Sequence, residues 1–154
     1  MWAAGEIFTY KKQVLEHHLD TYGHVNNAVY LQIYEEARWE LSENAGWGWG
    51  RVMRDRIGPV VLAANITYKK ELHNREWITI TTQFKKMRNS LVAILEQIIY
   101  NQDGRIASTL ELQIGMINLN TRKLLHPSDE FMHILGAQEV VEGPSDEENS
   151  STPL

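Results

Sequence analysis

The sequence predicts a single α+β domain in which an antiparallel sheet of long strands packs against one long helix. Between Asn27 and Ala45 the apolar residues recur at three- and four-residue steps, which is the period of an amphipathic helix. Four consecutive segments after it are rich in Val, Ile, Thr and aromatic residues and partly alternate, as strands do. With 154 residues, of which 43% are hydrophobic, the chain can bury one core but not two.

The first predicted element is a strand over Glu6 to Val14, which we expect in the same sheet. The long helix follows, and Asn26 or Asn27 is a favourable N-cap because a short side-chain oxygen accepts from the free N–H groups of the first turn. Gly46 stands where a C-cap glycine belongs. About 18 helical residues span roughly 27 Å, so we place this helix in the middle of the fold. Its predicted apolar stripe consists of Tyr30, Ile33, Tyr34, Ala37, Leu41 and Ala45.

The four strands are predicted at residues 59–70, 75–86, 90–101 and 105–119. The Asp-Gly pair at Asp103 favours a hairpin turn, because its backbone tolerates positive φ. Short connections between successive strands indicate an antiparallel meander. A short helix is predicted over Pro127 to Leu135, with proline near its first turn. Residues 1–137 then form the domain, and the acidic residues 138–154 form a tail that we expect to be disordered.

Composition excludes several classes of function. The chain contains no cysteine, which removes disulfides, thiolate metal sites and a thiol nucleophile. Four of the acidic residues lie in residues 141–154, so the folded body is close to neutral and lacks the basic face of a nucleic-acid-binding protein. No apolar run approaches the roughly 20 residues that span a bilayer, and no signal peptide is evident. We therefore expect a cytoplasmic protein without membrane or nucleic-acid partners.

Common catalytic motifs are also missing. The segment GWGWG, residues 46–50, resembles a phosphate-binding loop, but it follows a helix, so we interpret it as a helix exit with two tryptophans packed nearby. There is no G-x-S-x-G elbow and no H-E-x-x-H zinc motif. His17 and His18 point to opposite faces if they lie on a strand, so at most one of them joins His24, and no acidic pair completes a metal shell. We expect neither metal nor cofactor.

Asp20 is the residue whose position suggests chemistry. It lies in the loop HLDTYGHVNN, seven residues before the predicted helix start. The free N–H groups at a helix N-terminus carry about half a positive charge. A carboxylate beside such donors supplies the two parts that acyl transfer needs, namely a base or nucleophile and an oxyanion site. On these grounds alone, an aspartate that only caps a turn is an equally open interpretation.

The motif D-x-x-G-H-V-N-N, followed by Tyr and E-E-A-R, resembles the hotdog-fold acyl-CoA thioesterases of the 4-hydroxybenzoyl-CoA thioesterase type. The motif spans Asp20 to Asn27 and continues to Tyr30 and Arg38, and the resemblance covers residues 6–135. It implies a sheet wrapped around one long helix. It also implies hydrolysis of an acyl-CoA thioester to free acid and CoA, without metal or cofactor.

The resemblance also implies roles for individual residues. Asp20 acts as nucleophile or as general base on water, and the backbone N–H of Asn27 polarises the thioester carbonyl. His24 supports the loop that holds Asp20. Tyr30 is expected to line the acyl pocket, whereas Arg88 and Ser90 match positions that contact the nucleotide and pantetheine parts of CoA.

Two alternatives stay open at this stage. One is a thioesterase for acyl groups on carrier protein, although the position two residues before His24, where the plant enzymes of that type carry asparagine, is Tyr22. The other is a non-catalytic acyl-CoA binding module on the same fold. A sheet of long strands has edges that proteins usually pair or cover, and related proteins pair them between subunits, so we expect a homodimer or homotetramer.

Overall fold

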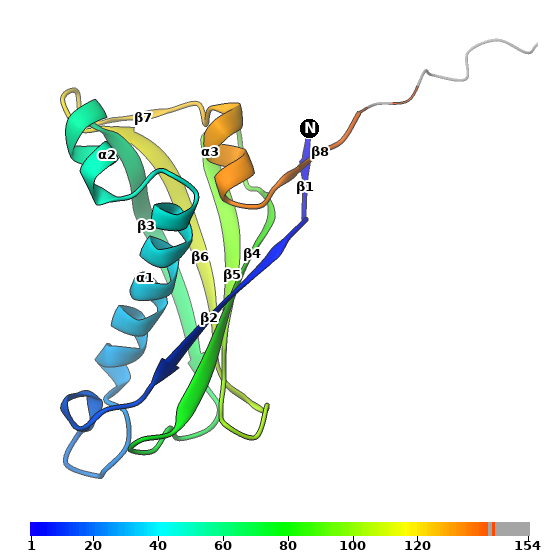
Figure 1. Cartoon of the computed structure of the whole chain (residues 1–154). Helices are drawn as coiled ribbons and strands as arrows, with labels where there is room; N and C mark the ends of the chain where they lie inside the picture. The colour runs from blue at the N-terminus through cyan, green and yellow to red at the C-terminus, as the bar shows by residue number, and fades with distance from the viewer. Residues whose placement is uncertain (142, 144–154) are drawn as a thin grey trace, which may run out of the picture.

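The structure, a computed structural model, describes residues 1–141 and residue 143. Its centre is one antiparallel sheet with the strand order β2-β4-β5-β6-β3. These strands are β2 (Ile7–Gln13), β3 (Ile57–Tyr68), β4 (Trp77–Met87), β5 (Val92–Tyr100) and β6 (Ile106–Asn118), and a short β7 (Lys123–Leu125) also pairs with β6. The helix α1 (Asn27–Asn44) runs along one face of the sheet, which curves around it (Figure 1). The predicted α+β architecture with one long helix is therefore confirmed.

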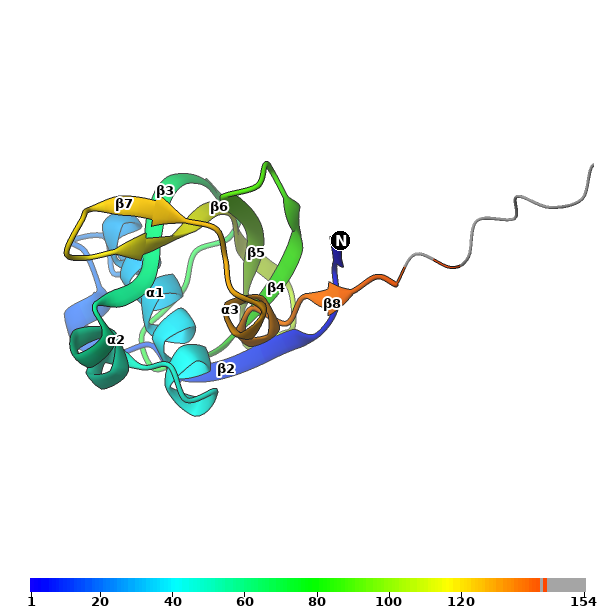
Figure 2. The ribbon, with the colours of Figure 1, turned by 90° about the horizontal axis from the view of Figure 1, so that it is seen from above.

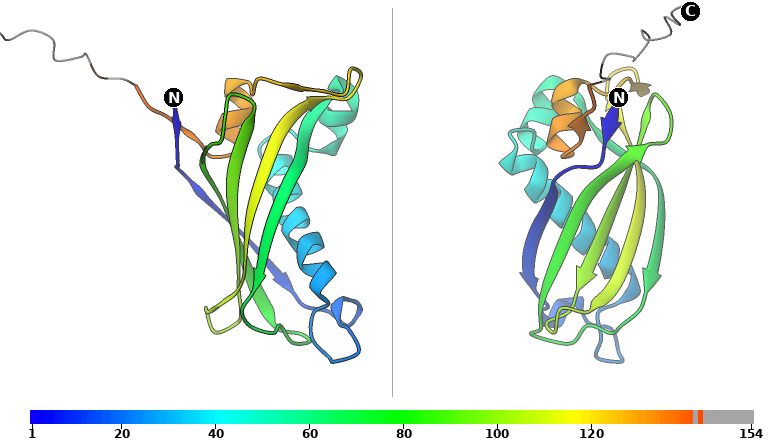
Figure 3. Two further views of the ribbon diagram at one scale, coloured as in Figure 1. Left: turned by 180° about the vertical axis from the view of Figure 1, so that it is seen from behind. Right: turned by 90° about the vertical axis from the view of Figure 1, so that its right-hand side faces the viewer.

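The order of the strands corrects one prediction. Strands β4, β5 and β6 form the expected meander, but β3 pairs with β6 at the far edge and not with β4. The edge of β4 that β3 would need is occupied by β2. Residues 69–76 therefore cross the end of the sheet as a long connection instead of turning back in a hairpin, as Figure 3 shows from behind.

Helix α1 begins and ends where its caps predict. The Asn26 side chain accepts a hydrogen bond from the Ala28 N–H at 2.9 Å, and Gly46 has a φ of +85°, which suits glycine after a helix C-terminus. Four of the six predicted stripe residues are buried against the sheet: Tyr30, Ile33, Tyr34 and Ala37. Leu41 is only half-buried and Ala45 is exposed, because the last turn of the helix packs less closely.

A buried polar network joins α1 to the sheet. Gln97 of β5 is fully buried, and its side-chain amide donates to the Tyr34 carbonyl at 3.1 Å and to Thr82 Oγ1 at 2.9 Å. Its Oε1 accepts from the Arg38 guanidinium at 2.8 Å. The Tyr34 hydroxyl donates to Ser108 Oγ at 2.8 Å. These bonds fix both the height and the rotation of α1 over the sheet.

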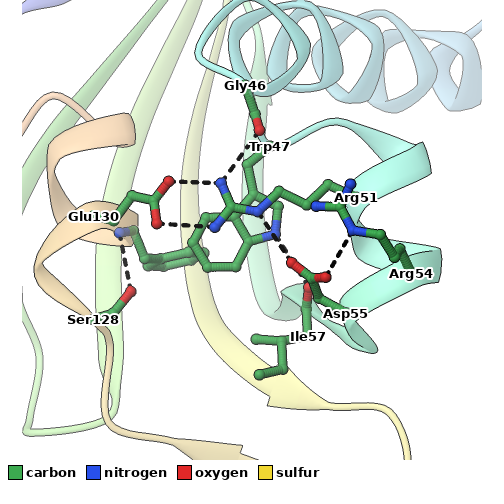
Figure 4. A network of polar contacts seen from close by, with 9 residues as sticks. Gly46, Trp47, Arg51, Arg54, Asp55, Ile57, Ser128 and Glu130 are labelled. Carbon is green, nitrogen blue, oxygen red and sulfur yellow. Dashed lines mark hydrogen bonds and ion pairs between the residues drawn. The ribbon is translucent and has the colours of Figure 1, made fainter.

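The C-terminal end of α1 is covered by two short helices, α2 (Trp49–Asp55) and α3 (Asp129–Ile134), which Figure 2 shows from above. Trp47 is buried, its Nε1–H donates to the Ile57 carbonyl, and the Arg51 guanidinium lies 4.1 Å above its ring. Arg51 also forms two hydrogen bonds with Glu130 of α3, at 2.6 and 2.9 Å (Figure 4). The α3 helix falls within the predicted segment, with Ser128 as its N-cap.

The segment GWGWG differs from its interpretation in one respect. It leads directly into α2, with Gly48 as N-cap, and only one of the two tryptophans packs, since Trp49 is 66% exposed. Near the N-terminus, β1 (Trp2–Ala3) pairs with β8 (Gln138–Glu139). The predicted tail of residues 138–154 thus begins with this short strand, and its residues 142 and 144–154 lie outside the described residues.

None of the helices among the described residues has the length and apolar character that a membrane crossing requires.

Candidate active site

Asp20 lies in a tight loop that is closed by backbone hydrogen bonds. The Asp20 N–H donates to the His24 carbonyl at 2.8 Å, and the Gly23 N–H donates to the Asp20 carbonyl at 3.1 Å. Gly23 has a φ of +83°, which a residue with a side chain would adopt only with strain. The Asp20 Oδ1 accepts from the Tyr22 N–H at 2.8 Å and from the His24 N–H at 3.4 Å. Within residues 1–141 nothing donates to its Oδ2, which is therefore free for chemistry.

The start of α1 provides the second part of the site. The Asn26 N–H donates to the His18 carbonyl at 2.9 Å, which ties the cap to the segment before the Asp20 loop. The Asn27 N–H, one residue further on, has no acceptor among the described residues. The Tyr68 hydroxyl donates to the Asn27 carbonyl at 2.9 Å and so holds the next peptide group, between Asn27 and Ala28. A free N–H at a helix start is a donor for a negatively charged oxygen.

Four of the residues predicted from sequence meet in one open pocket of about 370 Å³. They are Asp20, His24, Asn27 and Tyr30. The rest of its wall comes from Val25 and from the end of β3 and the following connection: Tyr68, Lys69, Lys70 and Glu71. Asp20, which has a carboxylate oxygen without a donor, and Asn27, which has a backbone N–H without an acceptor, therefore line the same space. Attack on a carbonyl requires groups of these two kinds close together.

Tyr30 forms the inner wall of this pocket and is only 4% exposed. Its ring meets the ring of Tyr68 edge-on, with centroids 5.0 Å apart, and its hydroxyl donates to the Lys70 carbonyl at 3.3 Å. Burial, with a smaller effect from Tyr68, raises the pKa of Tyr30 to about 12. The phenol is therefore neutral near pH 7 and serves as a wall and not as a base.

Sequence reasoning missed the residues that β3 and its following connection bring to the site. Tyr68, Lys69 and Lys70 end a strand that is paired at the far edge of the sheet, so nothing local indicated that they face Asp20. The same connection places Glu71 and His73 beside His24, and neither residue was considered as a neighbour of His24 in the sequence analysis. The sequence Tyr-Lys-Lys at the end of the predicted strand was the only signal that these residues belong to a site. The same sequence is equally typical of a solvent-exposed turn.

Arg88 and Ser90 do not join this pocket within one chain. They lie in the turn between β4 and β5, at the end of the sheet opposite the start of α1 (Figure 1). The Arg88 guanidinium donates to Gln113 Oε1 at 2.6 Å, and Ser90 lines a separate surface pocket with Lys86 and His126.

Glu36, the other carboxylate near the middle of α1, is occupied by structural contacts. It accepts hydrogen bonds from the Tyr10 hydroxyl at 2.9 Å and from Lys12 Nζ at 2.6 Å. Burial raises the pKa of Glu36, but these two hydrogen bonds outweigh it and leave the pKa below its ordinary value. Both hydrogen bonds are accepted by Oε2, so Glu36 links α1 to β2.

A second, apolar cavity of about 200 Å³ lies between the C-terminal half of α1, α3 and the inner face of the sheet. Its wall is largely aromatic and aliphatic, including Trp47, Leu95, Ile114 and Phe131. Arg38, whose guanidinium is directed to Gln97, is a charged residue on that wall. Burial lowers the pKa of Arg38.

Comparison with known proteins gives three kinds of similarity. The sequence profile described as "Thioesterase-like superfamily" matches residues 14–135. The long-chain acyl-CoA thioesterase FadM of Escherichia coli (strain K12) is 36% identical over 115 residues, which is 73% of this chain and 85% of FadM. The crystal structure of the probable thioesterase YbaW from Escherichia coli superimposes with a TM-score of 0.72 at 32% identity, covering 83% of this chain and 96% of that one.

More distant structures share the fold. A Staphylococcus aureus protein solved in complex with CoA has a TM-score of 0.74 at 20% identity and covers 97% of both chains. The DHNA-CoA thioesterase from Staphylococcus aureus has a TM-score of 0.70 at 21% identity and covers 78% of this chain and 80% of its own.

Proposed function

Because the chain belongs to the thioesterase-like superfamily and is an acyl-CoA thioesterase, we propose that Asp20 and the N-terminus of α1 form its catalytic centre. The hotdog fold and the thioester hydrolysis expected from the sequence are both confirmed by these similarities. The observation that supports the proposed centre is the shared pocket, which is lined by Asp20, with one carboxylate oxygen that accepts no hydrogen bond, and by Asn27, whose N–H has no acceptor among the described residues.

In the proposed mechanism the thioester carbonyl oxygen accepts a hydrogen bond from the Asn27 N–H. As the carbonyl carbon becomes tetrahedral, the negative charge on this oxygen is stabilised by that N–H and by the helix dipole, which is typically worth about 3 to 4 kcal/mol. Asp20 either takes a proton from the attacking water or attacks the carbon itself, forming an anhydride that water then cleaves. In both routes the C–S bond breaks, CoA leaves as a thiolate that is protonated, and the acyl group leaves as the acid.

His24 has a positioning role in this proposal. Its backbone carbonyl and N–H both bond to Asp20, so the residue fixes the loop from the main chain. Tyr68 has a similar role at the other side of the site, because its hydroxyl holds the Asn27 carbonyl and thereby orients the peptides of the first helical turn.

We also propose that the enzyme is a homodimer formed through β3, or a tetramer built from such dimers. One edge of the 12-residue β3 pairs with no strand among the described residues, and Val61 and Leu62 on it are 46% and 45% exposed. Antiparallel pairing of β3 with its copy reverses the second sheet. That brings the β4–β5 turn of one subunit toward the Asp20 end of the other, so Arg88 and Ser90 would contact CoA across the interface. Light scattering that gives a monomer at working concentration would contradict this assembly.

For the acyl group we propose a long aliphatic chain. The apolar cavity of about 200 Å³ begins on α1 at Glu35, and the eight residues from Asn27 to that position rise roughly 12 Å along the helix. A cavity of about 150 Å³ holds one benzene, so by proportion this one holds about eight carbon atoms. An acyl chain whose carbonyl is bound at Asn27 reaches such a cavity only if the acyl chain is long. This holds for the cavity of the same subunit and for that of the adjacent one.

The direct test of the catalytic centre is Asp20→Asn, assayed by loss of thioester absorbance with acyl-CoAs from short to long chain. The asparagine keeps an oxygen for the Tyr22 N–H, so the loop is expected to stay folded. We expect kcat to fall by at least about 100-fold, the size of a lost general base, with little change in KM or melting temperature. Asp103→Asn in the β5–β6 turn is the matched control because Asp103 does not line the pocket, and its rate should equal wild type. An Asp20→Asn enzyme as fast as this control would remove Asp20 from the mechanism.

A further inference from the structure

Two histidines from distant parts of the sequence lie side by side at the rim of the Asp20 pocket. His24 and His73 form an isolated antiparallel bridge between the Asp20 loop and the β3–β4 connection. The hydrogen bond from the Val25 N–H to the Leu72 carbonyl, 3.0 Å long, flanks the pair. His24 and His73 are therefore a non-hydrogen-bonded antiparallel pair. In such a pair the two side chains project from the same side of the backbone and lie close together. Fully buried Leu72 fixes the connection beneath them.

The side chains of this pair converge on one carboxylate oxygen. Glu71 Oε2 lies 3.1 Å from His24 Nε2 and 3.8 Å from His73 Nε2. One possible ligand atom from each of the three residues lies within 4.8 Å of the other two. Each imidazole thus directs its Nε2 toward a common point, which is the geometry of a preformed chelate and not of a scattered surface cluster.

A second carboxylate orients His73 from behind. Glu76 Oε2 lies 3.6 Å from His73 Nδ1 and accepts a hydrogen bond from the His73 N–H at 2.9 Å. Glu76 is itself held, because its Oε1 accepts from the Gln102 N–H at 3.0 Å. Glu76 therefore fixes the backbone of His73 and lies near its second ring nitrogen, which is where metal-binding histidines usually have a supporting group.

We propose that His24, Glu71 and His73 form a binding site for a divalent transition-metal ion of the zinc type, and that its occupation slows thioester hydrolysis. Two imidazoles and one carboxylate are ligands that Zn²⁺ accepts, and hard ions such as Mg²⁺ bind poorly to imidazole. The side chains of Glu71 and His73 are 63% and 64% exposed, so an ion can enter and water can complete its shell. The Glu71 carboxylate contributes one negative charge, which partly balances the two positive charges of the ion.

The effect on hydrolysis rests on the proposed function, because it depends on Asp20 being the catalytic carboxylate. His24 and Glu71 both line the pocket that contains Asp20 and the Asn27 N–H. A bound ion would join the Asp20 loop to the β3–β4 connection and narrow the entrance between them.

The test of binding uses Zn²⁺ alone with the full-length protein, by isothermal titration calorimetry in a buffer that does not chelate metals. We expect one ion per chain, and His73→Ala should weaken its binding by roughly ten-fold or more, at least the size of a lost supporting contact. The matched control is His126→Ala, which removes an exposed histidine elsewhere and should leave binding unchanged. Mg²⁺ should give no comparable binding. Equal affinity of wild type and His73→Ala for Zn²⁺, or equal affinity of wild type for Zn²⁺ and Mg²⁺, would overturn the site.

The test of inhibition follows thioester absorbance across the same Zn²⁺ concentrations. The fall in kcat/KM should have the same midpoint as binding, and His73→Ala, which lies outside the pocket lining, should keep wild-type activity and lose the inhibition. Binding without loss of activity would overturn the inhibitory role. Failure of the catalytic proposal would be distinguishable from failure of the metal site. In that case Asp20→Asn would be active, while calorimetry would still show Zn²⁺ binding to the wild-type protein.

Discussion

Replacing Gln97 by leucine should destabilise the protein strongly, because it breaks the polar network between α1 and the sheet. The Gln97 side chain makes three hydrogen bonds, one accepted from the Arg38 guanidinium and two donated, to the Tyr34 carbonyl and Thr82 Oγ1. Bonds to a charged group contribute about 1.5 to 3 kcal/mol and neutral ones about 0.5 to 1.5 kcal/mol each. After the gain from burying a leucine is deducted, we expect a loss of about 3 kcal/mol in the free energy of unfolding.

The same chain offers a closely matched control. Gln113 also accepts a hydrogen bond from an arginine, Arg88, but this pair is exposed, so water can replace it. Gln113→Leu should therefore cost less than about 1 kcal/mol. Both variants can be unfolded in urea and followed by tryptophan fluorescence. If Gln97→Leu lost no more stability than Gln113→Leu, burial of the network would not matter and the reasoning would fail.

A double variant tests the cause of the loss. Once Gln97 is replaced, the Arg38 guanidinium faces the apolar cavity without its acceptor, and this orphaned charge accounts for part of the cost. Adding Arg38→Met to Gln97→Leu should then restore stability relative to Gln97→Leu alone. Additive losses from the two substitutions would instead mean that the two side chains act independently.

Two further predictions concern tyrosines of the site. Burial raises the pKa of Tyr30 from 10.0 to about 12, so the neutral phenol stabilises the folded state. This contribution to the free energy of unfolding is fully present below pH 10 and is lost as the pH rises toward 12. Two pKa units correspond to about 2.7 kcal/mol. Tyr30→Phe should flatten the fall in urea-unfolding free energy over that range, and an unchanged slope would contradict this assignment. Tyr68→Phe removes the bond to the Asn27 carbonyl and should lower kcat several-fold with less than about 1 kcal/mol of stability lost. The control is Tyr22→Phe, which is 83% exposed, and equal kcat values for the two variants would exclude the positioning role.

The elements of this fold were predictable because their signals are local. The stripe of α1 repeats within one segment, and its caps, Asn26 and Gly46, stand beside the residues that they cap. The long strands likewise match the predicted segments to within a few residues. Helix α2 was missed because it is seven residues long and its N-cap is Gly48, so neither periodicity nor a side-chain cap marks it.

The same distinction separates the predicted half of the site from the missed half. Asp20 and Asn27 are seven residues apart, so a loop followed by a helix start was enough to bring them together. Tyr68 meets Asn27 across 41 residues, and His73 meets His24 across a similar separation, so both contacts depend on strand pairing. The partner of β3 depends on which strand edges are available, and β2 occupies the edge of β4 that β3 would need. No local sequence pattern specifies this long-range pairing.

The misplaced strand and the missing wall of the pocket have one cause. Since β3 lies at the far edge of the sheet, the chain must cross from that edge to β4 along the end where α1 begins. This crossing carries Lys69, Lys70 and Glu71 to the Asp20 loop and sets His73 opposite His24. Among the described residues it also leaves one side of β3 unpaired, and this is the edge through which we propose that a second copy pairs. A meander with β3 beside β4 would have needed only a short turn, and it would have left Asp20 with the helix start but without an enclosing wall.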